Sequence, residues 1–374
     1  MFLNNKIYGT TFYIDKINIE TIYGTFVAHT FQDLITKGYI IAIAHGNIKS
    51  EKLYVRYHSS CVTSETLRSL DCDCVKQLKG AFKKISEYGN GIIFYLMQEG
   101  RGCGYVGKSR ACMCVQHTHN KMTTFDAYDL LGMEKDYRSY QNIKDICEIL
   151  KIKSKFVLFT NNPDKINGLK NVGIKIDSIE SIEIAPNSFN SSYLKSKMES
   201  GHILKEKFIE NNYGLPPNLV EPFEPYTVPS VKRLTYVSAY YLPIKPINSN
   251  IILTIDEYNH LCKLANKNFT KYKLYNENYL VNIPDKKLYN EFTKIFCKPY
   301  WFKVNVFYDV VTQLDYVVLE YTPNKNATPI IRIHSESILN RFPLKDKSYG
   351  NLYKKSIELI IKNGNGYIFL FYND

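Results

Sequence analysis

The sequence lacks a hydrophobic run long enough to cross a membrane. Its 374 residues are 45% hydrophobic, but no apolar stretch approaches the ~18 residues that a spanning helix needs. The first six residues also lack the apolar core of a signal peptide. We therefore expect a cytoplasmic protein without a membrane partner, and the length of the chain favours two domains.

Cysteines at regular, paired spacings are missing as well. The nine cysteines are clustered, which disfavours a disulfide framework and is typical of a reducing compartment with a metal site. A block of basic residues is also absent, because the lysines behind the net charge of +12 are spread along the chain. This spread disfavours nucleic acid as a partner, and it leaves part of the charge available for a polyphosphate ligand.

Among the residues that are present, three cysteines lie within fourteen positions of one another. Cys72 and Cys74 flank one aspartate, so in an extended or turn conformation both sulfurs point the same way, and Cys61 can fold back to meet them. Three thiolates suit Zn²⁺, and no CxxC or HxxxH partner nearby supplies a fourth ligand. The pattern predicts one catalytic zinc per chain with an open coordination position. The alternative is three unliganded cysteines in a reducing compartment.

The order of the apolar segments predicts an α/β (α+β) fold built on a mixed sheet. Residues 6–50 carry β-branched, apolar strands separated by turn residues, which is typical of an antiparallel sheet. Apolar positions over 76–88 have helical spacing, and a buried strand follows over 91–97. The glycines of residues 98–108 then predict a loop whose backbone approaches phosphate. Further on, a helix is expected over 125–131, another over 143–150 and a strand over 156–159.

Ordered motifs over roughly residues 24–204 resemble the GTP cyclohydrolase II family, whose enzymes open the imidazole ring of guanine in riboflavin synthesis. The motifs are R-x-H-S-x-C-x-T at 56–63, S-L-D-C-D-C at 69–74 followed by Gln77, Q-E-G-R at 98–101, K-S-R at 108–110, Thr124, L-G at 131–132, D-Y-R at 136–138 and T-N-N-P at 160–163.

The resemblance implies a mechanism and a set of site residues. Zinc on Cys61, Cys72 and Cys74 activates water for attack on C8 of guanine, and formate is released. Arg138 acts as the nucleophile on the α-phosphorus and Asp136 as its proton acceptor, and pyrophosphate leaves while Mg²⁺ neutralises the phosphates. The implied partners are GTP or a related nucleotide and a second chain in a homodimer. The implied substrate-binding residues are Arg56, Tyr57, His58, Ser59, Ser60, Gln77, Glu99, Gly100, Arg101, Thr124, Thr160 and Lys165.

Two departures from the family pattern keep other functions open. Ser60 stands where the family usually has a glutamate, and Cys112 stands where the family has a tyrosine that assists ring opening. One alternative is a divergent paralogue that acts on another nucleotide or on an intermediate of pyrimidine catabolism. The others are a non-catalytic nucleotide- or zinc-binding module and a nucleic-acid-binding zinc protein, which only the charge favours. The presence of Asp136 and Arg138 favours an enzyme.

The second half of the chain echoes the first. Residues 331–337 (I-R-I-H-S-E-S) are similar to residues 55–61 (V-R-Y-H-S-S-C), but Ser337 replaces Cys61 and no cysteine matches Cys72 or Cys74. We predict a catalytic domain over 1–204, a Pro-rich linker over 205–230 and, over 231–374, a degenerate partial repeat of the same fold. The repeat would bind no zinc and would serve packing, dimerisation or regulation. Chance similarity of two βαβ-like stretches is the alternative.

Overall fold

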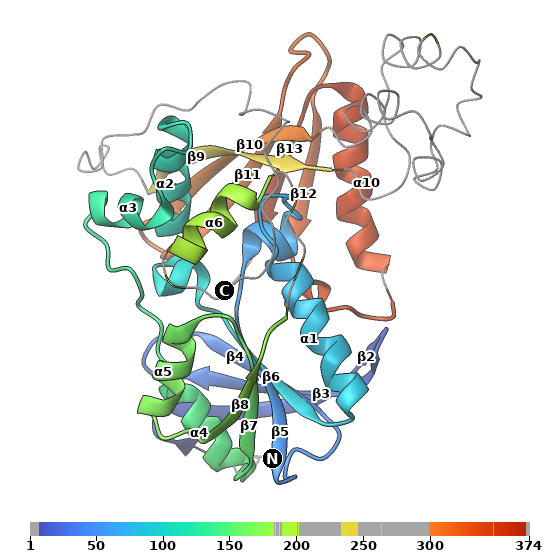
Figure 1. The fold of residues 1–374 in the computed structure, drawn as a ribbon. Helices are drawn as coiled ribbons and strands as arrows, with labels where there is room; N and C mark the ends of the chain where they lie inside the picture. The colour runs from blue at the N-terminus through green and yellow to red at the C-terminus, as the bar shows by residue number, and fades with distance from the viewer. Residues whose placement is uncertain are drawn as a thin grey trace.

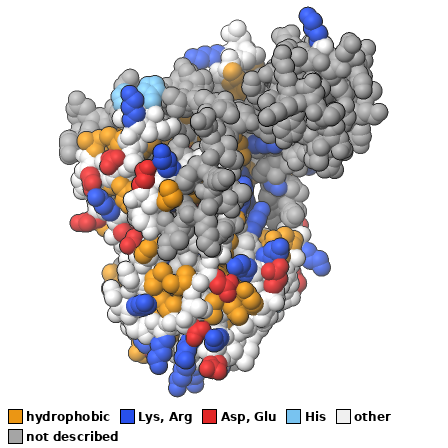
Figure 2. All heavy atoms as spheres, viewed as in Figure 1, with side chains coloured by type: hydrophobic (Ala, Val, Ile, Leu, Met, Phe, Trp, Pro, Cys, Tyr) orange, Lys and Arg blue, Asp and Glu red, His pale blue; other side chains and the backbone are white. Residues whose placement is uncertain are grey.

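The computed structural model describes residues 7–182, 184, 187, 189–199, 201, 233–245, 263, 299–346 and 348–371. These residues form two mixed sheets, one of eight strands and one of five (Figure 1). No helix among them is long and apolar enough to span a membrane. On the face that Figure 2 shows, Lys and Arg side chains are interspersed with Asp and Glu side chains.

The larger sheet begins as an antiparallel meander, as the sequence predicts. Its first strands are β1 (Ile7–Tyr8), β2 (Thr11–Thr21), β3 (Gly24–Asp33) and β4 (Tyr39–His45). Phe26 and Ala28 of β3 point to one side and are buried, whereas β4 is buried on both faces. The alternating pattern of β3 and the continuous apolar run of β4 follow from these positions in the sheet.

The parallel part of this sheet carries the predicted motifs. Strands β5 (Lys52–Ser59), β6 (Gly91–Leu96), β7 (Lys155–Phe159) and β8 (Ile176–Glu180) complete the order β1-β2-β3-β4-β6-β5-β7-β8. Because β5, β6 and β7 are parallel, their carboxyl ends meet at one edge of the sheet. That edge is where ligand sites form in α/β sheets.

Helices cover both faces of the larger sheet. Helix α1 (Cys74–Tyr88) packs on one face through residues at helical spacing and ends at Gly89, whose φ of 77° is left-handed. Helices α4 (Gln141–Leu150) and α5 (Pro163–Asn171) pack on the other face, where they contribute residues such as Ile143, Ile146 and Leu169 to the core. The predicted helices over 76–88 and 143–150 and the predicted strand over 156–159 are therefore confirmed within a few residues.

Short elements surround the carboxyl edge of the strands. They are the single turn η1 (Val62–Thr66), η2 (Glu99–Gly102), α2 (Gly104–His117), α3 (Thr124–Leu130) and α6 (Ser191–Glu199). The prediction of a glycine loop over the whole of 98–108 is wrong, because α2 already begins at Gly104. The backbone turns between β6 and α2 with positive φ angles at Gly100, Gly102 and Gly104, which glycine adopts without steric cost, so the turn needs only a few residues. Gly107 then lies inside the helix, where a Cβ would lie 2.9 Å from the sulfur of Cys103.

The smaller sheet repeats part of the larger one. Its strands are β9 (Leu234–Ile244), β10 (Tyr300–Asp309), β11 (Leu314–Tyr321), β12 (Ile330–Ser335) and β13 (Gly366–Phe371), in the order β12-β13-β11-β10-β9. The turn η4 (Ile338–Arg341) and helix α10 (Ser348–Asn363) connect β12 to β13. This is the order β5-β6-β4-β3-β2 with the same parallel and antiparallel pairs, and with η4 and α10 in place of η1 and α1.

The two copies also agree in register. Arg56 of β5 lies opposite Ile93 of β6, and Arg332 of β12 lies opposite Ile368 of β13. The expected fold class, a mixed-sheet domain followed by a partial repeat of the same fold, is therefore confirmed. The boundaries 1–204 and 231–374 remain predictions, and the predicted linker over 205–230 lies outside the described residues.

Candidate active site

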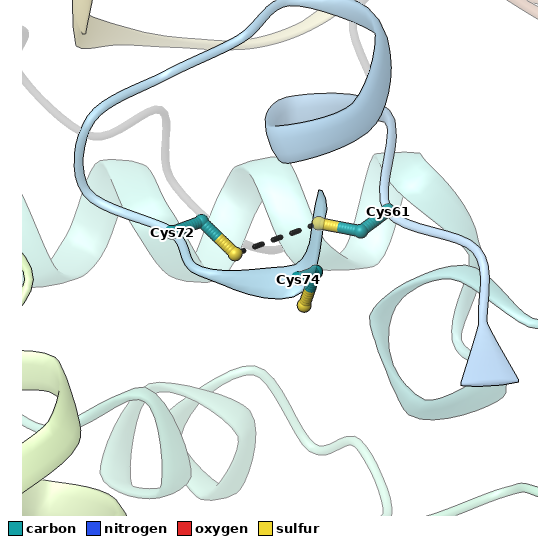
Figure 3. Close-up of side chains that lie close together, drawn as sticks. All are labelled: Cys61, Cys72 and Cys74. Carbon is teal, nitrogen blue, oxygen red and sulfur yellow. Dashed lines mark hydrogen bonds between the residues drawn. The ribbon is translucent and has the colours of Figure 1, made fainter. Parts of the chain in front are cut away.

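Three sulfurs converge at the carboxyl edge of the larger sheet. Cys61 follows β5, and Cys72 and Cys74 lie at the start of α1. The sulfurs of Cys61 and Cys72 are 3.7 Å apart, and all three sulfurs lie within 4.8 Å of one another (Figure 3). Two thiolates on one tetrahedral zinc are about 3.8 Å apart when each Zn–S bond is ~2.3 Å. The spacing therefore fits Zn²⁺, and no fourth His, Cys, Asp or Glu joins this group in the described chain.

The pKa values of the three thiols are also consistent with a site that binds a cation. Hydrogen bonds from Cys61 and Cys74 hold the pKa of Cys72 well below its ordinary value. The hydrogen bond with Cys72 raises the pKa of Cys61, and hydrogen bonds with Cys61 and Cys72 raise that of Cys74. Cys72 thus ionises easily, and its negative charge then disfavours ionisation of the other two thiols. A divalent cation is what allows all three to ionise together.

A buried ion pair supports the turn that follows Cys61. Glu99 accepts a hydrogen bond from the backbone N–H of Val62 at 2.6 Å and contacts the Lys108 ammonium at 2.7 Å. The same ammonium lies 3.3 Å from the Cys61 sulfur. Burial alone would lower the pKa of Lys108, but the charges of Cys61 and Glu99 raise it well above its ordinary value. Lys108 therefore stays a cation beside the sulfur cluster.

Further cations meet beside the sulfurs at the ends of β5 and β7. The Arg56 guanidinium donates to the Phe159 carbonyl at 2.8 Å and to the Gln77 amide oxygen at 2.5 Å, and its Nε has no partner among the described residues. Burial, together with repulsion from Arg56 and Arg138, holds the pKa of Lys165 well below its ordinary value. An anion placed between these side chains would relieve that repulsion, so the arrangement favours a phosphate ligand.

Asp136 and Arg138 form a bidentate ion pair. The Arg138 Nε donates to Asp136 at 2.8 Å, and a second nitrogen of the guanidinium donates to the other carboxylate oxygen. Burial would lower the pKa of Arg138, but the hydrogen bond to Asp136 raises it. The side chain of Arg138 is only 7% exposed and lines the cavity, whereas the side chain of Asp136 is 31% exposed and does not line it. Arg138 is therefore a cation that its hydrogen bonds to Asp136 hold in place at the wall of the cavity.

These groups line one cavity of about 550 Å³. Several buried oxygens at its wall, those of Ser59, Ser60 and Thr63, lack a hydrogen-bond partner in the part of the chain that the structure describes. A polar ligand in the cavity would supply the hydrogen-bond partners that these hydroxyls lack. The predicted site residues that line the cavity are Arg56, His58, Ser59, Ser60, Cys61, Cys72, Cys74, Gln77, Glu99, Gly100, Arg101, Thr124, Arg138, Thr160 and Lys165.

Tyr57 lies outside the lining of this cavity. Successive residues of a strand point to opposite faces, so Arg56 and His58 reach the cavity while the Tyr57 ring packs in the core below α4 and α5. Its ring stacks on Tyr140, and its backbone carbonyl accepts a hydrogen bond from Lys165 at 3.1 Å. The expectation that Tyr57 itself lines the ligand site is not met, and its contact with Lys165 gives it a supporting position.

Comparison with known proteins identifies the family. A family model described as GTP cyclohydrolase II matches residues 13–181. The chain is 37% identical over 203 residues to a GTP cyclohydrolase-2 of Shewanella baltica. The aligned segment covers 54% of this chain and 98% of that protein. The chain belongs to the GTP cyclohydrolase II family. This confirms the expected family and the expected enzyme class, a hydrolase.

Other similar proteins are longer than the matched segment. The riboflavin biosynthesis protein RibBA of Endomicrobium trichonymphae is 41% identical over 195 residues, which are 52% of this chain and 47% of that protein. The chain thus spans about half the length of this relative. A solved structure, RibBX, described as a two-domain 3,4-dihydroxy-2-butanone 4-phosphate synthase from A. baumannii, aligns over 47% of this chain and 41% of that chain, with a TM-score of 0.27 and 15% identity.

The cyclohydrolase II pocket contains residues that the sequence did not indicate. Tyr193 and Lys197 of α6 line it, and the Lys197 ammonium lies 4.2 Å from the centre of the Tyr193 ring. Tyr240 of β9 lines it beside Cys112 of α2, so the second half of the chain contributes to its wall. Burial raises the pKa of the Cys112 thiol to about 12, so this thiol is neutral at physiological pH. No local pattern could have indicated Tyr240, because its position depends on how the two halves pack.

Proposed function

We propose that this chain is a zinc-dependent GTP cyclohydrolase II that opens the guanine imidazole ring of GTP and releases formate and pyrophosphate, the first step of riboflavin biosynthesis. The observation that carries the proposal is a three-cysteine cluster with zinc-like spacing in the same cavity as several buried cations. Zn²⁺ held by Cys61, Cys72 and Cys74 would supply an activated water.

Residues of the chain would bind the phosphates, attack the α-phosphorus and recognise the nucleotide. Arg56 and Lys165 would bind phosphate oxygens, since both lie at the wall of the cavity, and the charge of a phosphate would favour the protonated form of Lys165, whose pKa burial and neighbouring cations lower. Mg²⁺ would accompany the phosphates. Arg138 would attack the α-phosphorus as Asp136 takes its proton, and their bidentate hydrogen bonds hold the two groups in the geometry for that transfer. The Ser60 hydroxyl, which has no partner among the described residues, would hydrogen-bond to the nucleotide, and Ser59 lies beside it at the wall of the cavity.

The experiment is an assay of the purified chain with GTP, Mg²⁺ and Zn²⁺, in which formate and pyrophosphate are measured separately. The proposal expects both products in equal amounts. Pyrophosphate without formate would mean that only the phosphoryl step takes place. Neither product from a zinc-loaded chain would refute the proposed activity.

A second candidate is a divergent cyclohydrolase that acts on a different nucleotide or on an intermediate of pyrimidine catabolism. Cys112 favours it, because the neutral thiol replaces the phenol that the family resemblance implies at this position. Running the same assay with a panel of purine and pyrimidine nucleotides separates the two candidates. Tight GTP binding without turnover of any nucleotide would instead favour the non-catalytic module.

We also propose that the protein works in the cytoplasm. The seven cysteines in the described residues are free thiols, and such thiols persist in a reducing compartment. The family resemblance implies a homodimer, and the packing of the two halves described next leads to a different proposal.

A further inference from the structure

The two halves of the chain contact each other reciprocally. Ile244, at the end of β9, pairs with Ser69 after η1, and Thr21, at the end of β2, pairs with Leu344 after η4. Because β9 is the counterpart of β2 and η4 that of η1, these are the same contact made twice. The hydrogen bonds agree, since the Leu70 N–H donates to the Pro243 carbonyl at 2.9 Å and the Lys345 N–H donates to the Glu20 carbonyl at 2.9 Å.

Each half also inserts an equivalent apolar side chain into the core of the other. Leu67, two residues before Ser69, is fully buried in the core of the smaller sheet and α10. Phe342, two residues before Leu344, is 4% exposed and lies in the core formed by the larger sheet and α1. The Phe342 ring is 5.2 Å from the Tyr95 ring. Reciprocal, self-complementary contacts of this kind are the signature of a twofold interface.

Besides helix α2, whose Tyr105 hydroxyl contacts that of Tyr240, the first half takes part through the loop between Cys61 and Cys72, two of the proposed zinc ligands. The second half holds this loop at three consecutive residues. Thr66 donates to the Glu336 carboxylate, the Leu67 carbonyl accepts from the Tyr353 hydroxyl at 3.2 Å, and Arg68 donates to the Asn340 carbonyl at 3.1 Å.

A buried polar chain continues from this interface to the cavity. Arg341 is 2% exposed, pairs with Glu336 at 2.9 Å and donates to the Tyr95 hydroxyl at 3.1 Å. The Tyr95 hydroxyl donates to Glu65 at 2.6 Å, and the other oxygen of Glu65 lies 2.6 Å from Nε2 of His58, which lines the cavity. The second half is thus joined to the site by hydrogen bonds as well as by packing.

We propose that the C-terminal half is a built-in second subunit, which occupies the surface that a second copy of the catalytic half would use and clamps the loop between the zinc-binding cysteines. The clamping part rests on the proposed zinc site. A partner linked in the same chain is present at a high effective concentration, so a free second chain cannot compete for this surface. The protein is therefore a monomer with one active site.

The first test is the mass of the full chain in solution, measured by light scattering after size exclusion over a wide range of concentration. The proposal expects the mass of one chain, 43.4 kDa, at every concentration. A particle of twice that mass would overturn it.

The second test is the rate at which the zinc-loaded full chain releases Zn²⁺ to a colorimetric chelator. Tyr353→Phe removes the hydroxyl that holds the Leu67 carbonyl and leaves the ring in place, and Arg341→Met removes the buried guanidinium. The control is Tyr316→Phe, because Tyr316 lies on β11 and its ring packs against Phe371 within the second half. Losing a buried hydrogen bond costs about 1 kcal/mol or more, so both test variants should release zinc at least about fivefold faster than the control.

The outcomes separate the clamp from the zinc site. Equal release from Tyr353→Phe, Arg341→Met and the control would overturn the clamp. If the wild-type chain holds no zinc, the proposed metal site fails, and the clamp is then tested by amide hydrogen exchange of residues 62–70 in the metal-free chain. Faster exchange there in Tyr353→Phe than in Tyr316→Phe supports the clamp, and equal exchange overturns it. Arg341→Met could fail to fold, but the conservative Tyr353→Phe keeps the proposal testable.

Discussion

Replacing Phe342 with alanine should lower the free energy of unfolding of the chain, because its ring fills a space in the core of the other half. The ring is 4% exposed, meets the Tyr95 ring edge-on at 5.2 Å and lies 6.0 Å from the Phe82 ring of α1. Truncating a buried phenylalanine to alanine costs about 3–5 kcal/mol, because apolar contact is lost and a cavity remains. The edge-on ring pair accounts for about 0.5–1.5 kcal/mol of that loss.

The assay is urea unfolding of the full chain, followed by circular dichroism and by the fluorescence of its single tryptophan, Trp301 of β10. Phe369→Ala is the matched control, since Phe369 lies on β13 of the same half and is 37% exposed. We expect a free energy of unfolding about 3 kcal/mol lower for Phe342→Ala and less than about 1 kcal/mol lower for the control. If both variants lose the same stability, the insertion of Phe342 into the catalytic half contributes nothing and the reasoning is wrong.

Three further predictions concern the site and the packing of the halves. Cys72→Ser/Cys74→Ser should abolish zinc binding in metal analysis, because one thiol remains of the three within 4.8 Å, and full occupancy would contradict the ligand assignment. Arg138→Ala should reduce pyrophosphate release far more than Arg110→Ala, since Arg138 lines the cavity and pairs with Asp136, and equal losses would contradict its role. Ending the chain before Lys205 should lower solubility or change the oligomeric state by exposing Leu67, and a soluble, fully active fragment whose mass in solution is that of one shortened chain would refute this.

Features set by neighbouring residues could be predicted from the sequence. The end of α1 at Gly89 follows from a left-handed glycine, and the start of α3 follows from the reciprocal hydrogen bonds of Thr123 and Asp126. The repeat was visible because the second copy keeps the same apolar periods and the same glycines at 364 and 366, which correspond to those at 89 and 91. The cysteine cluster followed from spacing alone.

Features that depend on packing could not be predicted in this way. Four glycines over 98–108 indicate a loop, but Gly104 and Gly107 belong to α2, and position 107 is a glycine because the Cys103 side chain leaves no space for a Cβ there. The contact of Tyr240 with Tyr105, at 2.6 Å between their hydroxyls, joins residues 135 positions apart. The position of Tyr57 outside the cavity could have been predicted, because successive residues of a strand point to opposite faces and Tyr57 lies between Arg56 and His58.

The loop between the proposed zinc ligands Cys61 and Cys72 is also the loop that docks the second half, and this would couple zinc binding to docking. Thr66, Leu67 and Arg68 contact the second half, and Cys61 and Cys72 lie at the two ends of the segment. A cation that binds the loop best in its docked form stabilises docking, and by linkage docking tightens the binding of the cation by the same factor. The second half has no cysteine at the positions of the three ligands. It can nevertheless affect zinc affinity, because it restricts the conformations of the segment that joins two of the three sulfurs.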